Sequence, residues 1–514
     1  MSTSKKILTF TDAKRVFEKL RKEGKKIVQC HGTFDLLHPG HIVHFEEAKA
    51  LGEVLVITIT GEEYVNKGPG RPYFNDILRM KSLAALQCVD YVVVIPYPAA
   101  VEAIELVRPH IYCKGKEYEN PEVDVSGDIH DDIKTVERLG GKVAYVGSVV
   151  FSSTKLLNKH FEVHPQKVKE FCKNLAKAYT PNDFRKIVEG FKDIKVLVIG
   201  DIIFDYYSTV RVQGLTSKNR IISTRLIKQD MQAGGALAVF RHIKQFAPQI
   251  KLISLVGKEP WVNEALSEYV GRKKEDGIIR HKQFTTIVKE RFVEPLNEGK
   301  ELSKLFSVNI IEEKHPGKEI QKEVCDRIDG CIEDYDLVVV MDFGHGLCAE
   351  SVRQLVQEKS RFLALNCQTN SNNHGFNLID RQYCRADSFS LDETELTLAC
   401  GKREIQFYDE LKKLHDKFGA RYGWLTRGAT DTIGIKREEP ECICAPFETS
   451  IIDTIGAGDA FSSLASLAAV KNLPIDLATF MGQLAGAQAV RIVGNAESIN
   501  KNKFLKGGMS LLSF

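Results

Sequence analysis

Hydrophobic residues in the first 160 positions follow two different spacings. Segments such as 54–60 (VLVITIT) and 91–95 (YVVVI) are short apolar runs, typical of strands buried on both faces of a parallel sheet. Segment 11–24 instead spaces its apolar residues three or four positions apart, which predicts an amphipathic helix capped by Thr11 or Asp12. Because strands and helices alternate, we predict a parallel three-layer α/β sheet.

The alternation is interrupted once along the chain. Residues 163–192 are polar with helical spacing, and we interpret them as a linker. The strand–helix pattern resumes at DIKVLVIGD and continues almost to residue 514. We therefore predict two α/β domains, a Rossmann-like domain over 1–162 and a three-layer α/β/α domain over 193–514.

The composition limits the classes of function. A net charge of +3 over 514 residues does not predict a nucleic-acid or membrane surface. The apolar runs are far shorter than the roughly 20 residues of a membrane span. The first residues, MSTSKKILTF, contain no apolar signal-peptide region, so we expect a cytoplasmic protein with free cysteines.

Residues 31–41, HGTFDLLHPGH, connect a predicted strand to a predicted helix. Ligands of open parallel sheets bind at the carboxyl ends of the strands, and Gly32 allows a close approach of ligand to backbone. His38 and His41 flank the helix start, where imidazoles beside backbone N–H groups suit the phosphates of a nucleotide. An isolated pair of this kind also fits an ordinary loop with a capping histidine.

Four segments in order resemble nucleotidylyltransferases of the cytidylyltransferase-like fold, and heptose-1-phosphate adenylyltransferases in particular. These segments are 32–41, 71–86, 108–118 and 151–160. The resemblance implies phosphate contacts from His38 and His41, positive charge from Lys114, and nucleotide contacts from Gly32, Thr33, Phe34, Ser153 and Thr154. Arg79 either points into this site or pairs at the surface. The Gly-Thr-Phe-Asp sequence of this motif is more similar to that of glycerol-phosphate cytidylyltransferases, so both ATP and CTP remain open as substrates.

A second cluster, DTIGAGD at 453–459, precedes a predicted helix. The turn Gly456-Ala457-Gly458 leaves backbone N–H groups available to an anion. Asp459 follows it and is placed to accept the proton of a hydroxyl that attacks ATP. The motif resembles the signature of ribokinase-type (PfkB) sugar kinases.

Other segments resemble the same kinases in the same order. They are 198–205, 233–240, 286–292, 341–346 and 425–434. The resemblance implies sugar contacts from Asp201, Asp205, Gly234, Gly235, Lys289 and Arg291, ATP contacts from Thr426, Gly428, Gly456, Ala457 and Gly458, and an indirect link to Mg²⁺ from Glu393. It also implies a small β-lid, for which residues 208–229 are the candidate, and through that lid a homodimer.

Several positions depart from the kinase pattern. Ala238 stands where the family carries a sugar-contacting Asn, His345 replaces a Lys, and Ser390 replaces the Asn of an Asn-x-x-Glu motif. The family's Asp-Pro-Lys appears as Asn366, Cys367 and Gln368. Asp459 is intact, which favours a working kinase.

Together the two halves resemble bifunctional heptose-7-phosphate kinase/heptose-1-phosphate adenylyltransferases with their domains in reversed order. The resemblance implies that one half phosphorylates a sugar or sugar phosphate with ATP and Mg²⁺. The other half then transfers a nucleotidyl group from ATP or CTP to the sugar 1-phosphate. Two alternatives remain: a nucleotidylyltransferase whose kinase-like half only dimerises or senses sugar, and a regulatory protein that only binds nucleotides.

Overall fold

The computed structural model describes residues 3–119, 128–147, 164–271, 277–295, 302–312, 316–370, 373–402 and 404–513. The chain forms two compact units, Met1–Pro181 with Leu505–Phe514, and Asn182–Phe504. The predicted domain limits at 162 and 193 remain a prediction. Within the described ranges, no helix has the length and apolar character needed to cross a membrane.

The first unit contains a six-stranded sheet in the order β1-β4-β3-β2-β5-β6, and all its neighbouring strands are parallel. The strands are β1 (Ile7–Leu8), β2 (Ile27–Gly32), β3 (Val54–Thr60), β4 (Tyr91–Ile95), β5 (Ile111–Gly115) and β6 (Lys142–Val146). Around this sheet the described α-helices include α1 (Thr3–Lys6), α2 (Phe10–Lys22), α3 (Pro39–Lys49), α4 (Asp76–Ala84), α5 (Val101–Val107) and α6 (Asp128–Arg138), and α8 (Gln166–Ala178) follows them in the same unit. This order confirms the predicted parallel α/β sheet.

The sheet of the first unit is covered on both faces. Alternate residues of β3 enter two different hydrophobic clusters: Leu55 and Ile57 pack with Phe45 of α3, whereas Val56 packs with Phe17 of α2. This explains why β3 is apolar without alternation, since both faces of the strand are buried. Helix α2 begins earlier than predicted, because Thr9 is the cap and its Oγ1 accepts the backbone N–H of Asp12 at 3.1 Å.

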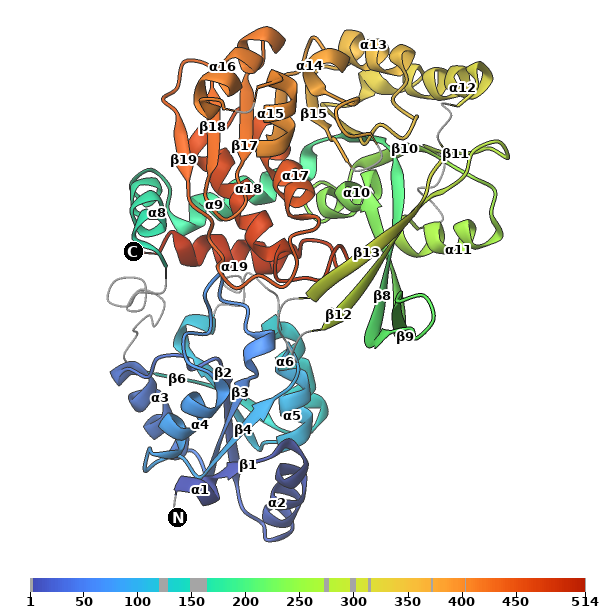
Figure 1. The fold of residues 1–514 in the computed structure, drawn as a ribbon. Coiled ribbons are helices and arrows are strands. Elements are labelled where there is room, and N and C mark those ends of the chain that lie inside the picture. The colour runs from blue at the N-terminus through green and yellow to red at the C-terminus, as the bar shows by residue number, and fades with distance from the viewer. Residues whose placement is uncertain are drawn as a thin grey trace. The chain divides into compact units, whose positions relative to one another are not determined.

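The second unit is built on a nine-stranded sheet in the order β11-β10-β7-β14-β15-β16-β17-β18-β19 (Figure 1). Its strands are β7 (Val196–Gly200), β10 (Ile250–Val256), β11 (Ile278–Arg280), β14 (Leu337–Asp342), β15 (Leu363–Cys367), β16 (Ser388–Asp392), β17 (Tyr422–Thr426), β18 (Thr432–Lys436) and β19 (Cys442–Cys444). All pairings are parallel except the two that join β17, β18 and β19. The carboxyl ends of the parallel strands therefore meet at one edge of the sheet.

Helices on both sides complete this unit. They include α10 (Ala236–Lys244), α11 (Pro260–Tyr269), α12 (Lys318–Asp329), α13 (Glu350–Lys359), α14 (Ile379–Gln382), α15 (Glu393–Cys400), α16 (Phe407–Phe418), α17 (Ala457–Val470) and α18 (Ile475–Ala489). Helices α8 (Gln166–Ala178) and α9 (Pro181–Glu189) occupy the predicted linker, and α19 (Lys501–Leu511) ends the chain. Helices α17 and α18 are buried along most of their length, which explains their small and apolar composition.

A separate four-stranded sheet, which we call the lid, projects from the second unit (Figure 1). Its order is β13-β12-β8-β9, with β8 (Ile202–Leu215), β9 (Ile222–Gly235), β12 (Ile287–Pro295) and β13 (Leu302–Ile310). The prediction of a β-lid from residues 208–229 is confirmed. Strands β12 and β13 add the half of the lid that this range left out.

Candidate functional site

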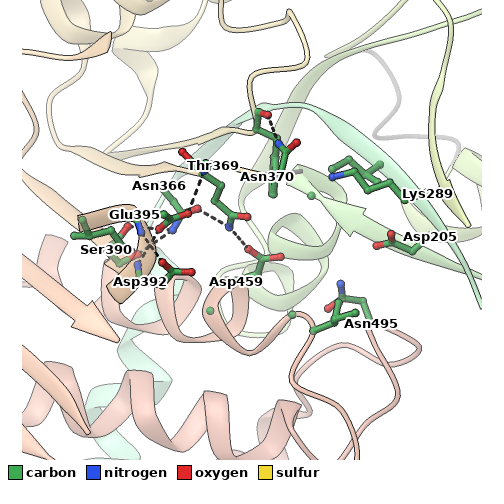
Figure 2. Close-up of a pocket in the computed structure, with 18 of the residues that line it drawn as sticks. Asp205, Lys289, Asn366, Thr369, Asn370, Ser390, Asp392, Glu395, Asp459 and Asn495 are labelled. Carbon is green, nitrogen blue, oxygen red and sulfur yellow. Dashed lines mark hydrogen bonds between the residues drawn. The ribbon is translucent and has the colours of Figure 1, made fainter. Parts of the chain in front are cut away.

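A cavity of about 340 Å³ lies in the second unit, at the carboxyl ends of β15, β16 and β17 (Figure 2). The lid contributes Asp205 and Lys289 to one side, and the start of α17 contributes Gly456 and Asp459 to the other. Ligands of parallel α/β sheets bind at this edge, where strand ends, loops and helix starts converge. The position of the cavity therefore makes it the candidate site of this unit.

The turn before α17 brings backbone donors to the cavity. Gly456 is the N-cap of α17 and has a φ of +82°, a conformation that L side chains rarely adopt. A Cβ atom at this position would also lie 2.2 Å from Oδ1 of Asn495, which lines the cavity as well. Ala457 is the first helical residue. The N–H of Ala457 donates to the carbonyl of Thr454 at 3.3 Å, whereas Gly456 and Gly458 line the cavity at the helix start, where backbone N–H groups suit an anion.

Asp459 lies in the first turn of α17 and lines the cavity (Figure 2). Its Oδ1 accepts a hydrogen bond from Nε2 of Gln368 at 2.9 Å. Burial raises the pKa of this carboxyl to about 7, against the opposing effect of the Gln368 hydrogen bond. A carboxyl whose pKa lies near neutral pH is suited to act as a general base, because a large fraction is ionised at that pH and it binds a proton more strongly than an ordinary carboxylate.

Gln368 belongs to a chain of polar contacts at three of the substituted positions. Its Nε2 also donates to Oδ1 of Asn366 at 2.8 Å, and Nδ2 of Asn366 donates to Oγ of Ser390 at 3.2 Å. All three residues line the cavity. The three side chains therefore form a neutral hydrogen-bonded network at the carboxyl ends of β15 and β16.

The lid side of the cavity carries an acidic group and two cations. Nη1 of Arg291 is hydrogen-bonded to Oδ1 of Asp205, and Oδ2 of Asp205 would lie 2.3 Å from a Cβ on residue 234, which explains the glycine there. Burial lowers the pKa of Lys289, whose charged neighbours include Asp205 and Asp459. Gly235 lines the cavity beside them. The predicted substrate residues on the lid are thus gathered at one place.

Asp201 is placed differently from the other predicted substrate residues. Its carboxylate accepts the backbone N–H groups of Phe343, His345 and Leu347 at 3.2–3.3 Å. Burial and the charge of Asp342 raise its pKa to about 7. Asp201 is not among the residues that line the cavity. It organises the turn after β14, and Asp205 is the residue of this pair that reaches the site.

Glu395, rather than Glu393, lines the cavity. Glu393 is exposed, whereas Glu395 is buried and accepts the backbone N–H of Asp392 at 2.8 Å. Asp392 in turn caps α15 through the N–H of Glu395, which completes a capping box. Burial, followed by the charge of Asp392, raises the pKa of Glu395 to about 8. The Asp-x-x-Glu pattern before an apolar run was the signal in the sequence that identifies Glu395.

The predicted ATP loop of this unit is only partly at the cavity. Thr426, the last residue of β17, lines it. Gly428 has a φ of +52° in the turn that follows, which an Arg427–Asp431 pair closes at 2.6 Å. Gly428 and Ala457 do not line the cavity as it stands.

In the first unit, His38 and His41 lie together at the start of α3. His38 is the N-cap, and the two imidazole rings stack with centroids 3.8 Å apart and planes at 15°. Burial lowers the pKa of both; for His41, with further contributions from His38, His44 and Lys67, the pKa falls to about 3. Both rings are therefore neutral at pH 7 in the ligand-free chain, and each can donate one hydrogen bond.

The loop between β2 and α3 is held in place by the ring of Phe34 and by the side chain of Arg79. Phe34 has a φ of +46°, and its ring closes on Gly32, where a Cβ would lie 3.0 Å away. Arg79 is 1% exposed and donates to the carbonyls of Thr33 at 2.7 Å and Thr60 at 2.9 Å. Arg79 therefore ties the loop to the end of β3, and its guanidinium also pairs with the partly exposed carboxylate of Asp76.

Asp35 is a residue of this loop that the motif did not single out. Its carboxylate accepts the backbone N–H groups of Tyr73 and Phe74, each at 2.9 Å. It thereby holds segment 71–74 beside the loop. The sequence around Asp35 does not indicate this contact, because Tyr73 and Phe74 lie almost 40 residues further along the chain.

Lys114 lies near the end of β5, and its ammonium is paired with Asp132. Nζ of Lys114 is 2.8 Å from Oδ2 of Asp132, which also accepts the hydroxyl of Tyr112 at 3.1 Å. The charge of Lys114 is the second cause of the low pKa of His31, about 3, after burial. Lys114 is therefore a cation close to the strand end that leads into the histidine loop. Ser153 and Thr154 lie outside the described residues.

Two family models match the chain. Residues 29–230 match the cytidylyltransferase-like family, and residues 378–502 match the pfkB family of carbohydrate kinases. Neither match covers half of the chain. The second match contains the cavity residues from Ser390 to Asn495.

Known proteins share part of this sequence. The bifunctional protein HldE of Aliarcobacter butzleri is 41% identical over 138 residues, 26% of this chain and 29% of that protein. The HldE of Magnetococcus marinus is 39% identical over 153 residues, 29% of this chain and 30% of that protein. The match thus spans less than a third of each relative. A solved structure of Arabidopsis thaliana ribokinase with ribose and ATP aligns with a TM-score of 0.47 and 16% identity, over 62% of this chain and 99% of that one. The chain therefore contains a region similar to the cytidylyltransferase-like family, followed by a region similar to the pfkB family of carbohydrate kinases.

Proposed function

We propose that the chain is a bifunctional transferase of nucleotide-sugar synthesis. Its second unit phosphorylates the anomeric hydroxyl of a sugar or sugar phosphate of the heptose 7-phosphate type with ATP. Its first unit transfers a nucleotidyl group from ATP or CTP to the resulting sugar 1-phosphate and releases pyrophosphate. The observation that carries the proposal is the buried carboxyl of Asp459, with a pKa of about 7, beside the open start of α17.

In the kinase step, Asp459 accepts the proton of the attacking hydroxyl. The N–H groups of Gly456 and Gly458 hold the phosphoryl group that is transferred, where fixed dipoles stabilise developing charge without reorganisation. Lys289 faces the same cavity and can neutralise part of that charge or bind an anionic acceptor. The lid side, with Asp205 and Arg291, contacts the acceptor.

Mg²⁺ fits this cavity as a companion of the nucleotide. Among the described residues, no group of three or more His, Cys, Asp or Glu side chains forms a metal cage. Glu395 and Asp392 line the cavity, but their oxygens already accept backbone N–H groups. Such a pair suits an ion that arrives on the phosphates, keeps most of its waters and is reached through them. Bound Mg²⁺ would neutralise phosphate charge during transfer.

In the nucleotidylyl step, the neutral imidazoles of His38 and His41 donate hydrogen bonds to the phosphates of the nucleotide. The negative charge of a triphosphate would raise their pKa values from the low ligand-free level, so that positive charge appears where it is needed. Lys114 adds a fixed cation, oriented by Asp132. Gly32, Thr33 and Phe34 form the backbone on which the nucleotide lies, with Ser153 and Thr154 as further contacts.

A phosphorus NMR time course with ATP, Mg²⁺ and heptose 7-phosphate tests the kinase step. A new anomeric phosphate signal in the wild type, absent in Asp459→Asn, is the expected result. If the wild type and Asp459→Asn both lack the signal while pyrophosphate is still released from ATP or CTP with a sugar 1-phosphate, the chain is a nucleotidylyltransferase only. Comparing ATP with CTP in that second assay identifies the base.

We further propose a homodimer formed through the lid. The lid exposes large apolar side chains on β8, β9 and β13: Leu215, Ile222, Leu226, Phe306, Val308 and Ile310. Exposed apolar surface of this kind favours association. Light scattering of the wild type and of Leu226→Asp should give a dimer and a monomer, respectively. The cytoplasm remains the predicted compartment.

A further inference from the structure

Asp453, three residues before Gly456, takes no part in the chemistry described above, yet its carboxylate collects four donors. Oδ1 accepts Nζ of Lys304 at 2.8 Å and the backbone N–H of Ile455 at 3.2 Å. Oδ2 accepts the hydroxyl of Tyr207 at 2.8 Å and the backbone N–H of Gly494 at 3.0 Å. Every strong acceptor direction of this carboxylate is therefore used inside the second unit.

The four donors come from two sides of the candidate site. Tyr207 lies on β8 and Lys304 on β13, so both belong to the lid. Ile455 lines the cavity at the turn before α17, and Gly494 directly precedes Asn495, which also lines it. Asp453 is thus the junction between the lid and the backbone that surrounds the anion-binding turn.

The charge of the junction is balanced by the lid. The side chain of Asp453 is fully buried, whereas that of Lys304 is 42% exposed. Burial raises the pKa of Asp453, but the hydrogen bonds from Lys304, Tyr207 and Ile455 outweigh burial and lower it overall. Removing one partner from a buried ion pair leaves an uncompensated charge, which is strongly unfavourable. The lid position in which Lys304 reaches Asp453 is therefore electrostatically favoured.

The same lid strands carry the cations of the cavity. Strand β12 pairs with β8 and β13, with Arg291 opposite Tyr207 and Val293 opposite Lys304. A shift of β8 and β13 away from Asp453 would therefore carry Lys289 and Arg291 with it. The distance between these cations and the turn at Gly456 depends on whether the junction is closed.

We propose that Lys304 and Tyr207 are positioning residues, which act through Asp453 to hold the lid's substrate-contacting side chains in register with the anion-binding turn of α17. The expected effect on acceptor binding rests on the proposed kinase function. The coupling of the lid to the turn through Asp453 does not require a substrate. Acceptor and phosphoryl donor then meet in one geometry, because the lid and the turn share a buried charged contact.

Hydrogen–deuterium exchange of the ligand-free full chain tests the structural core. Lys304→Met should raise the exchange rates of 302–310 and of 453–460 together, by about tenfold, since local opening is governed by the contacts that are lost. The matched control is Lys228→Met, which removes a pair of 63% and 48% exposed side chains on β9 of the same lid. The control should leave 453–460 unchanged. Faster exchange in the lid alone, or equal exchange in both variants, would overturn the proposal.

Kinetics with heptose 7-phosphate and ATP test the consequence. We expect Lys304→Met to raise KM for the acceptor about tenfold with kcat lowered less, because a loosened lid costs binding of the acceptor. Lys304→Arg should restore KM to within about threefold, since guanidinium keeps the charged hydrogen bond. A structural role alone would leave KM unchanged and give no rescue. If the wild type lacks kinase activity, the proposed function fails, while the exchange experiment still decides the positioning role.

Discussion

Replacing Gln368 should move the ionisation of Asp459 in a direction set by the substituted side chain. Nε2 of Gln368 donates to Oδ1 of Asp459 at 2.9 Å, and this bond stabilises the charged carboxylate against burial. A hydrogen bond to a charged group is worth about 1.5–3 kcal/mol. At about 1.4 kcal/mol per pKa unit, Gln368→Leu should raise the pKa of Asp459 by about 1–2 units from its value of about 7.

Gln368→Lys should have the opposite effect. It places an ammonium within reach of the same carboxylate, and an opposite charge at this range lowers a carboxyl pKa by about 1–3 units. Two variants of one residue thus bracket the wild type from both sides. General instability of the cavity cannot produce shifts of opposite sign.

The assay measures ADP formation at saturating ATP and Mg²⁺ while the concentration of a sugar phosphate acceptor is varied. The value of kcat/KM for this acceptor is determined from pH 5.5 to 9.5. Activity should rise with pH through the pKa of Asp459, since the base must be ionised, with the midpoint higher in Gln368→Leu and lower in Gln368→Lys. The carboxyl carbon resonance of Asp459 gives the same pKa without an acceptor. Asn370→Ala, a cavity change whose amide donates to the carbonyl of Phe343 instead, is the control and should not shift the midpoint. Shifts of the same sign in both Gln368 variants would refute the assignment of Asp459 as the titrating group.

Three further outcomes follow from the structure. Asp459→Asn should reduce ADP formation by about 10²–10⁴-fold, the usual contribution of a general base, while raising the melting temperature of the second unit more at pH 8 than at pH 5 in a calorimetric scan. His41→Asn should lower pyrophosphate release by at least about 10²-fold and leave ADP formation by the kinase unchanged, which an equal loss of both activities would contradict. Arg79→Met should lower the free energy of unfolding in urea by about 3 kcal/mol, because the carbonyls of Thr33 and Thr60 lose their donor and Asp76 loses its partner, whereas the exposed Arg15→Ala should lower it by less than about 0.5 kcal/mol.

The fold was predictable because its signals are local. Runs such as VLVITIT identify strands buried on both faces, and glycine or proline marks where helices begin and end. The limits of elements are less well determined: Thr9 caps α2 although Thr11 and Asp12 are equally suitable residue types, and only the backbone conformation decides among them. Strand β13 was missed because its alternating, partly exposed pattern carries no continuous apolar run.

The parts of the site that lie next to each other in the chain were predictable too. The turn 456–458 and Asp459 form one continuous motif, as do His38 and His41. Contacts between distant segments were not: Gln368 reaches Asp459 across 91 residues, and Lys304 reaches Asp453 across 149. The substitution at Gln368 looked like the loss of a cation, and only the tertiary structure shows that its amide donates to the candidate base.

Two buried carboxyls of the candidate kinase site lower the stability of the second unit as pH rises, because folding raises their pKa values. Asp459 and Glu395 have folded-state pKa values of about 7 and 8, above ordinary values of 3.8 and 4.5. A carboxyl whose pKa is raised by folding contributes stability below its unfolded pKa and loses it as pH rises through the folded pKa. The second unit should therefore weaken between about pH 4 and 8, the same interval in which Asp459 becomes a competent base. The burial that raises the pKa of Asp459 for proton transfer is thus the same burial that makes its charged form unfavourable. An asparagine here would avoid this cost, but it could not accept the proton.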